Sequence, residues 1–310
     1  MEVALYHPEL GYYSSAKPRI GNDGDFYTSS DLDPIFGKLL SEQFLKWSQD
    51  FADFTIVELG AGKGHLARHI LNHHKFRYRI LERSAAMREH QRESLAGFDV
   101  EWIDTLPEAL NGVVFSNEFF DALPVHRFIG RPDGAKEIFV GEHFEEIERE
   151  PGIAPDFVLQ EGQVVDVSSG AREWVRRIAQ SIRNGFHVAI DYGYLRPEFF
   201  AQPRGTLMCY YRHQAHENPY IHIGDQDITA HVNFSDLIDE GSAHGLELAG
   251  ISSQKDFLVG IGILDEMQQL AIAGDAQSMQ RLLKMKTLII PTRMGERFKV
   301  LVQRKCFPTR

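Results

Sequence analysis

Short apolar runs alternate with helical patterns along most of the chain. The first run, residues 54–58, is followed by a helical pattern over 65–74. A second run at 78–82 is followed by a helical pattern over 85–95. Several of the runs are apolar throughout, which is typical of strands covered by helices on both faces. The pattern therefore predicts βαβ units and a mostly parallel sheet.

Further segments extend this alternation in both directions. Pro34 begins a helical pattern that reaches Trp47, ahead of the first strand. The tail predicts helices through about residue 290. We expect these elements to form one Rossmann-like α/β domain over residues 1–310. The other predicted strands lie at 100–103, 112–116, 186–191, 246–251 and 297–302.

Two segments interrupt the alternation. Residues 125–168 contain short alternating pieces separated by Pro and Gly, which indicates an inserted β subdomain. Residues 194–233 show no clear periodicity, and we expect a second, irregular insertion there. The opening segment, up to about residue 34, is rich in turn-forming residues and predicts no regular element.

Composition and charge narrow the class of protein. The chain is 43% hydrophobic and 25% charged, with a formal net charge of −11. This charge argues against broad binding to nucleic-acid phosphates. No apolar run approaches the roughly 20 residues that cross a bilayer, and the first residues resemble neither a signal peptide nor a transit segment. We therefore expect no nucleic-acid partner, no membrane insertion and a bacterial cytoplasmic location. The alternative is a mitochondrial matrix protein whose transit segment has been removed.

A glycine loop follows the first predicted strand. Gly60, Gly62 and Gly64 are spaced G-x-G-x-G, and glycines between a strand and a helix let a ligand approach the backbone. The alternative is a tight turn with no ligand. A dinucleotide fingerprint would need its third glycine at His65, so a nicotinamide-dependent oxidoreductase is disfavoured.

Two acids near this loop favour a ligand without phosphate. Glu58 ends the first strand, and Glu82 ends the second, where an acid typically binds ribose hydroxyls. Phosphates prefer helix N-termini and basic groups, whereas S-adenosylmethionine (SAM) carries a sulfonium and an ammonium. The loop therefore favours SAM, with Glu58 near its ammonium group. A solvated strand-end carboxylate is the alternative for Glu82.

A polar motif follows the fourth predicted strand. Asn117, Glu118 and Asp121 lie beside two aromatic residues, at the carboxyl edge of the sheet. Such groups at the mouth of a pocket can orient a substrate nitrogen, so we expect these three to be catalytic. A carboxylate could also hold a guanidinium and accept its proton. The alternative is a capping turn in which Asn117 or Asp121 satisfies a helix N-terminus.

Several segments together resemble the MidA-type, or DUF185, family of SAM-dependent methyltransferases. The resemblance spans nearly the whole chain in family order, so it is far more specific than the glycine loop alone. It rests on segments 7–13, 24–29, 58–64, 117–124, 191–193 and 227–232.

The resemblance implies a class I methyltransferase fold, with a seven-stranded sheet whose last strand is antiparallel. The family includes a mitochondrial complex I assembly factor that methylates an arginine. The resemblance therefore implies SAM as cofactor and arginine N-methylation of a respiratory-complex-type partner, with symmetric dimethylarginine as product. By motif position it assigns SAM binding to Gly60, Ala61, Gly62, Gly64 and Glu82, and the pocket to Asp25, Tyr27, Thr28 and Ser29.

Other constellations support weaker hypotheses. His65, His69 and His73 share one helix face, but no zinc-protease motif accompanies them, and we expect no metal site. The run Tyr210–His213 and His231 in the second insertion could contact substrate or pack the insertion onto the sheet. No nucleophile elbow is present for a hydrolase.

The two insertions also bear on the substrate. Their surface exceeds what a small molecule needs, and both follow strands that end at the crevice, so we expect a protein segment as the methyl acceptor. The alternative is that they cover a sheet edge or form a homodimer. Two rival functions also stay open: a non-catalytic assembly chaperone that retains a SAM-binding fold, and a methyltransferase for another substrate.

Overall fold

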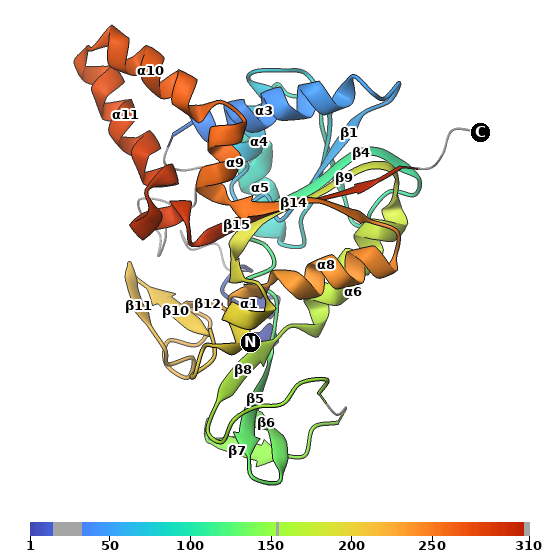
Figure 1. Cartoon of the computed structure of the whole chain (residues 1–310), viewed down its shortest axis with the longest axis vertical. Coiled ribbons are helices and arrows are strands. Elements are labelled where there is room, and N and C mark those ends of the chain that lie inside the picture. Colours follow the sequence, from blue (N-terminus) through green and yellow to red (C-terminus); the bar gives the residue numbers. More distant parts are fainter. Residues whose placement is uncertain (15–32, 153–154, 307–310) are drawn as a thin grey trace.

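The computed structural model describes residues 1–14, 33–152 and 155–306. A large central sheet dominates it (Figure 1). Its strands are β1 (Thr55–Leu59), β2 (Arg77–Leu81), β3 (Val100–Ile103), β4 (Leu110–Asn117), β9 (Ile182–Tyr194), β13 (Val232–Asn233), β14 (Glu247–Ser253) and β15 (Phe298–Lys305).

The central sheet is mainly parallel. Its strand order is β3-β2-β1-β4-β9-β15-β14, and β13 adds a short parallel strand beside β9. β15 runs antiparallel to both of its neighbours. The predicted α/β fold with an antiparallel last strand is therefore confirmed. The sheet has eight strands rather than the seven predicted. The additional strand is β13, whose two residues are too few to show a periodicity in the sequence.

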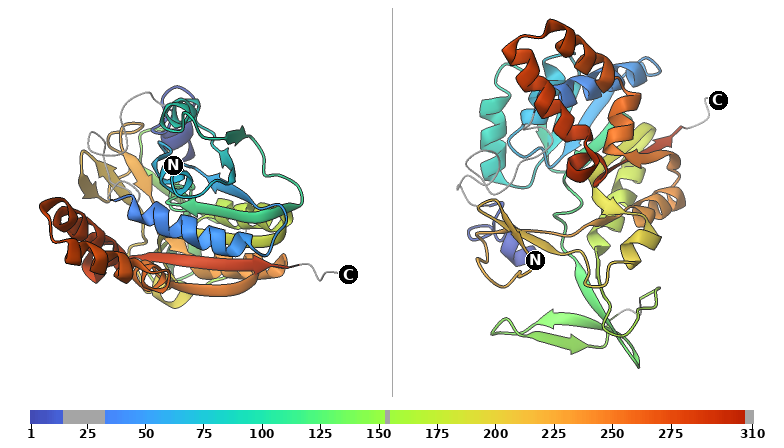
Figure 2. Two further views of the ribbon diagram at one scale, coloured as in Figure 1. Left: turned by 90° about the horizontal axis from the view of Figure 1, so that it is seen from above. Right: turned by 60° about the vertical axis from the view of Figure 1, so that its left-hand side comes forward.

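Helices cover both faces of this sheet, as Figures 1 and 2 show. None of those within the described residues has the length and apolarity needed to cross a bilayer. One face carries α3 (Ile35–Ser48), α4 (His65–Leu71) and α5 (Ala85–Ser94), and the other carries α6 (Ser169–Ser181) and α8 (Phe234–Ala243). On the side of α3, the chain continues into α9 (Gln254–Gly260), α10 (Ile263–Ala273), α11 (Ala276–Ile289) and the short π-helix Pro291–Gly295.

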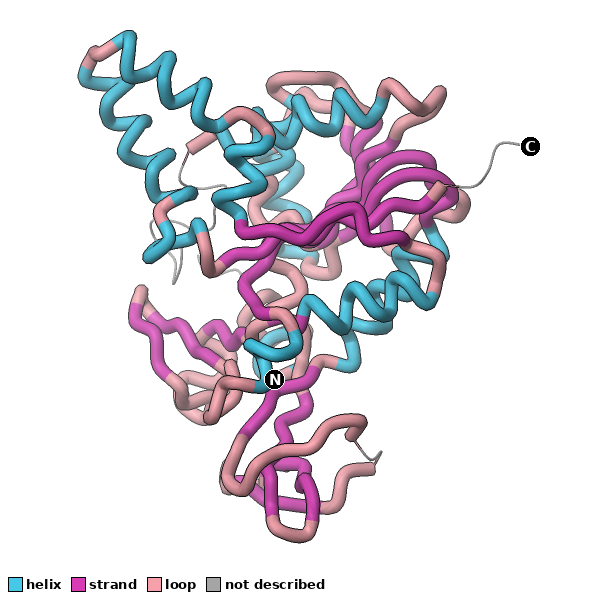
Figure 3. Tube along the Cα trace, in the orientation of Figure 1, coloured by secondary structure: helices cyan, strands magenta, loops and turns pink. Residues whose placement is uncertain are grey.

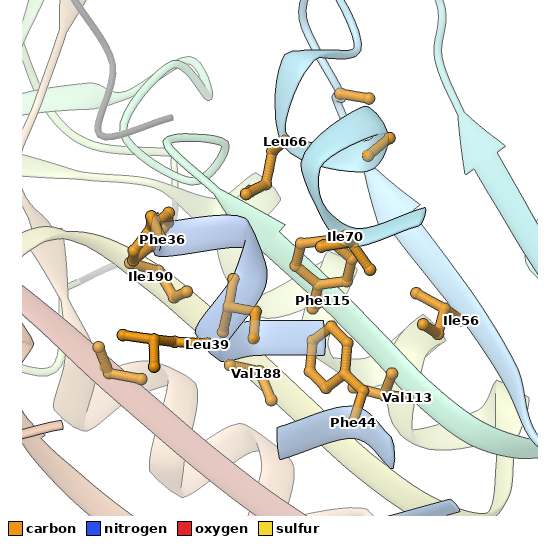
Figure 4. Packing of buried hydrophobic residues seen from close by; sticks show 14 of the residues in the cluster. Phe36, Leu39, Phe44, Ile56, Leu66, Ile70, Val113, Phe115, Val188 and Ile190 are labelled. Atoms are coloured by element: carbon orange, nitrogen blue, oxygen red, sulfur yellow. The ribbon is translucent and has the colours of Figure 1, made fainter. Parts of the chain in front are cut away.

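The core consists of two apolar layers, one on each face. On the first face, Phe36 and Phe44 of α3 and Ile70 of α4 pack against Phe115 and Val188 of the strands (Figure 4). On the second face, residues of α6 and α8 pack against the opposite sides of the same strands. Because both faces are covered, every residue of β1 is buried.

Two smaller sheets lie below the central one in Figure 1. The first is antiparallel, in the order β7-β6-β5-β8, and projects as an arm (Figure 2). The second has the order β11-β10-β12, so residues 194–233 are more regular than the sequence suggested. The bounds are β5 (His126–Arg131), β6 (Gly134–Val140), β7 (Glu146–Arg149), β8 (Val164–Val167), α7 (Arg196–Phe200), β10 (Met208–Tyr211), β11 (Gln214–His216) and β12 (Asp227–Thr229).

The strand order reverses between β1 and β4, which is where open α/β sheets form a ligand crevice. The carboxyl ends of β1, β2, β4 and β9 meet along this edge because these strands are parallel. Figure 3 shows loops between the central sheet and the two smaller sheets on this side. The short N-terminal helix α1 (Glu2–Tyr6) also lies here.

Candidate active site

The glycine loop has the backbone conformation that its sequence predicts. Gly60, Gly62 and Gly64 have φ angles of 62°, 52° and 78°, in the left-handed region that favours glycine. A Cβ added at Gly60 would lie 2.9 Å from the ring of Phe119, on the loop after β4. The loop is therefore closely packed on one side and exposes bare backbone to a cavity on the other.

Glu58 lies in the wall of the same cavity and is almost completely buried, with 2% of its surface exposed. The hydroxyl of Tyr78 on β2 donates a hydrogen bond to Glu58 Oε2 at 2.6 Å. Burial raises the pKa of Glu58 to about 7, although this hydrogen bond acts in the opposite direction. A buried carboxylate of this kind gains from a neighbouring cation, such as an ammonium group.

Gln91 on α5 links the glycine loop to Glu82. Its Nε2 donates to Gly62 O at 2.8 Å and to Glu82 Oε2 at 3.1 Å, while its Oε1 accepts from the indole of Trp102 at 2.9 Å. Glu82 Oε1 also accepts from the backbone of Ser84. Burial raises the pKa of Glu82. The second-strand acid is therefore fixed in orientation by the Gln91 side chain of α5 and by the backbone N–H of Ser84, which precedes this helix.

The N-terminal segment covers this part of the cavity. Tyr6 on α1 donates to the carbonyl of Ala122 at 2.9 Å. Seven residues later, the carbonyl of Tyr13 accepts from Ser84 Oγ at 2.7 Å. The two tyrosine rings stack with their centroids 5.6 Å apart. This segment thus spans the cavity from the β2 side to the loop after β4, and both rings contribute to its wall.

The loop after β4 presents its polar groups at two depths. Asn117 and Glu118 lie in the cavity wall, and the amide of Asn117 donates to Glu118 Oε1 at 2.9 Å. Asp121 lies behind them, 3% exposed and outside the wall of that cavity. Burial and the neighbouring Asp191 hold the pKa of Asp121 well above its usual range.

These groups surround one cavity of about 650 Å³. Gly64 is not in its wall, because it turns the chain into α4 instead. Asp25, Tyr27, Thr28 and Ser29 lie outside the described residues. The predicted site residues that the cavity does bring together are Glu58, Gly60, Ala61, Gly62, Glu82, Asn117 and Glu118.

The donors and acceptors of this cavity fit SAM. The Gly60–Gly62 backbone leaves room for a ligand, and Glu82 places in the cavity wall a carboxylate of the kind that can accept from ribose hydroxyls. Glu58 suits the ammonium of the amino-acid tail. The Oδ1 atom of Asn117 is buried and has no hydrogen-bond partner among the described residues, so it can accept from a ligand. Because SAM carries no phosphate, the cavity needs no phosphate-binding group to hold it.

The histidines of the predicted row lie in different surroundings. His65 contributes to the cavity wall, whereas His69 packs close to Gly37 of α3. Within the described ranges, no group of three or more His, Cys, Asp or Glu side chains could hold a metal ion.

Several residues that contribute to the site were given no role in the sequence prediction. Among them are Gln91, Tyr6 and Asp191. Of these three, only Asp191 could have been found from the sequence, since it is an acid at the end of a buried apolar run, as Glu58 and Glu82 are. Its carboxylate accepts backbone hydrogen bonds from the loop after β4.

Comparison with known proteins agrees with this geometry. A crystal structure of a Burkholderia thailandensis protein with bound S-adenosyl-homocysteine superposes with a TM-score of 0.90 and 31% sequence identity. That match covers 98% of this chain and 86% of the other.

Curated relatives match along almost the whole chain. The mitochondrial protein arginine methyltransferase NDUFAF7 of Rattus norvegicus is 29% identical over 353 residues, covering 96% of this chain and 78% of the relative. The human protein of the same name is 27% identical over 350 residues, covering 96% and 77%.

A family model also matches, described as a putative S-adenosyl-L-methionine-dependent methyltransferase, over residues 37–252. The matched segment contains the glycine loop, the second-strand acid and the loop after β4. The chain belongs to this family and is a SAM-dependent methyltransferase.

Proposed function

We propose that this methyltransferase modifies arginine side chains of a partner protein, with symmetric dimethylarginine as the product. The partner we propose is a subunit of a respiratory-complex-type assembly. The proposal is supported by the relatives named protein arginine methyltransferase, which match 96% of this chain. The chain's net charge of −11 also suits a cationic acceptor and repels polyanions.

The observation that carries the proposal is the position of Glu118. Its carboxylate lies in the cavity wall next to Asn117, whose Oδ1 has no partner among the described residues. A carboxylate can hold a guanidinium through two parallel hydrogen bonds, and an amide oxygen can accept a third. The loop therefore offers acceptors at the point where a planar, cationic side chain needs them.

Each residue of the cavity has a distinct task in this proposal. Bound SAM supplies an activated methyl group. Glu58, Glu82 and the glycine backbone hold the cofactor, and Asn117 and Glu118 align the acceptor nitrogen. Glu118 then accepts the proton that this nitrogen loses as it gains the methyl group. Asp121 lies too deep to touch the acceptor, and it affects the site only through electrostatic interactions with the neighbouring groups of the loop.

We also propose a role for the two insertions. Residues 125–168 and 194–233 branch from the single domain after β4 and β9, and their sheets lie on the cavity side (Figure 1). Tyr13 binds Asp227 of β12 through its hydroxyl at 2.8 Å, so the second insertion is joined to the cavity cover. The insertions then form walls for an extended acceptor segment.

The test uses the full chain with tritiated SAM and protein extract from the source organism. We expect label in protein, on arginine, with mass spectrometry identifying symmetric dimethylarginine. Glu118→Gln is the inactive control. Label that resists protease but disappears with nuclease, or that runs only as a small molecule, contradicts a protein acceptor. Label on lysine contradicts only the assignment of arginine as the acceptor residue, and it leaves the protein acceptor standing.

A further inference from the structure

The end of β9 holds the loop after β4 through one carboxylate. Asp191 is fully buried, and its Oδ2 accepts from the backbone N–H groups of Phe119, Phe120 and Asp121 at 3.1, 2.9 and 3.3 Å. Its Oδ1 accepts from the N–H of Tyr192 at 2.9 Å. Both carboxylate oxygens are thus used to fix the position of one short turn.

This attachment coincides with backbone strain at Glu118. The φ angle of Glu118 is 54°, in the left-handed region that non-glycine residues rarely adopt. Its N–H donates to the carbonyl of Ile190 at 2.9 Å, which joins the strained residue to the strand that carries Asp191. A strained residue persists only where its surroundings determine it strongly, so β9 sets the direction of the Glu118 side chain.

The carboxylate of Glu118 is held from two strands. Asn117 of β4 donates to Oε1 at 2.9 Å, and the hydroxyl of Tyr192 on β9 donates to Oε2 at 3.5 Å. The Tyr192 ring cannot swing away easily, because it packs edge-on against Phe298 of β15, with ring centroids 4.7 Å apart. On another side it lies next to the ring of His231, with centroids 6.0 Å apart.

The charges around Tyr192 keep its hydroxyl a donor. Burial raises its pKa well above the ordinary value, and the carboxylates of Asp121, Glu118 and Asp191 raise it further, with Tyr210 as the remaining titratable neighbour. Burial also lowers the pKa of His231 to about 4, so this ring is neutral at pH 7. The phenol therefore remains a donor throughout the working pH range, and it is shared between Glu118 and the buried Asp121, whose pKa its hydrogen bond lowers.

We propose that Tyr192 is a positioning residue for methyl transfer, whose hydroxyl holds the Glu118 carboxylate toward the acceptor nitrogen. This inference rests on the proposed function only in that Glu118 faces the acceptor. The acceptor nitrogen forms a bond to the methyl carbon as the bond between that carbon and the sulfonium sulfur breaks, which leaves S-adenosylhomocysteine, and the nitrogen loses one proton, which Glu118 accepts. A carboxylate oxygen can accept more than one hydrogen bond, so the bonds from Asn117 and Tyr192 are compatible with acceptor binding.

The test is Tyr192→Phe, which removes only the hydroxyl. We expect kcat to fall about tenfold, with the KM for SAM unchanged within about twofold. The acid limb of the pH–rate profile should move to higher pH by about half a unit or more, because a carboxylate that loses a donor ionises less readily. A purely structural role would lower the rate without moving this limb.

A second replacement reverses the direction of the effect. Site-specific exchange of Tyr192 for 3-fluorotyrosine makes the phenol a stronger donor, and the acid limb should then move to lower pH. Tyr194→Phe is the matched control, because the Tyr194 ring packs against His231 with centroids 5.1 Å apart. We expect this control to keep the wild-type profile.

The outcomes separate this inference from the proposed function. An unmoved acid limb in folded Tyr192→Phe, or a parallel loss of SAM binding measured by calorimetry, overturns the role of Tyr192. If the wild-type acceptor proves not to be arginine, the proposed function fails, yet the same variants compared on the true acceptor still decide the role of Tyr192.

Discussion

On the side of the cavity where we propose that SAM binds, the polar groups come from one stretch of chain, Glu58 to Gln91. On the acceptor side, the loop 117–121 is held by β9, and the N-terminal cover joins it through Tyr6. The first side is built from neighbouring βα units, whereas the second depends on contacts between distant segments. The two sides should therefore respond to different substitutions, and the predictions below test this separation.

The largest effect is expected at the glycine loop. Gly62→Val should abolish the micromolar binding of SAM that we expect of the wild type, because a β-branched residue at a φ of 52° is strained and its side chain occupies ligand space. Calorimetry with SAM and S-adenosyl-homocysteine measures this. Gly97→Val is the control, since Gly97 also has a positive φ but faces open space. Unchanged SAM affinity in folded Gly62→Val would place the cofactor elsewhere.

The next effect is expected on the acceptor side. Glu118→Gln should lower methyl transfer by about 100-fold or more and leave SAM affinity within a few-fold of wild type. The substitution keeps the shape of the side chain but removes the charge that we propose holds the acceptor and takes its proton. Glu142→Gln, at an exposed turn, is the control. Parallel loss of activity and SAM binding would assign Glu118 to the cofactor side.

A smaller effect should follow from Gln91→Leu. The substitution leaves the carbonyl of Gly62, the carboxylate of Glu82 and the indole of Trp102 without their partner. We expect about tenfold weaker SAM binding, and a free energy of unfolding lower by about 2 kcal/mol. Calorimetry and chemical denaturation measure the two quantities, with exposed Gln268→Leu as the control. Unaltered SAM affinity would show that Glu82 needs no support from α5.

The smallest effect concerns pH. Because the pKa of Glu58 is raised to about 7, its carboxylate is protonated at pH 6 and ionised at pH 8. SAM, with its ammonium group, should therefore bind a few-fold more tightly as pH rises through 7. The stability that Glu58 contributes to the free protein has the opposite sign, being full below pH 4.5 and lost as pH approaches 7. Glu58→Gln should flatten both profiles, and a pH-dependent SAM affinity retained in that variant would contradict this role.

The sequence predicted the central sheet well because its strands are apolar runs between helical patterns. It also indicated Glu58, the glycine loop and Glu82, which the structure brings into one cavity wall, because each of them follows or ends a recognisable strand. Helix α6 was missed, although Val175 and Ile178 repeat at helical spacing. The strands of the second insertion have two to four residues, too few to show alternation.

The missed site residues share one physical feature. Gln91 is polar and completely buried, and its partners lie on the glycine loop, directly after β2 and on β3, so nothing near it in sequence marks it. Tyr6 binds a backbone carbonyl 116 residues away. Such contacts depend on the packing of elements, which periodicity alone does not specify.

The long sequence separation of the acceptor-side contacts has a consequence for folding. The hydroxyl of Tyr6 binds the carbonyl of Ala122 across 116 residues, and the N–H of Phe120 binds Asp191 across 71, whereas the glycine loop and Gln91 are 29 residues apart. Closing a long loop costs more chain entropy than closing a short one, and contacts between distant segments tend to form slowly. A refolding chain should thus regain its affinity for SAM before its catalytic rate, passing through a state that holds the methyl donor but cannot yet use it.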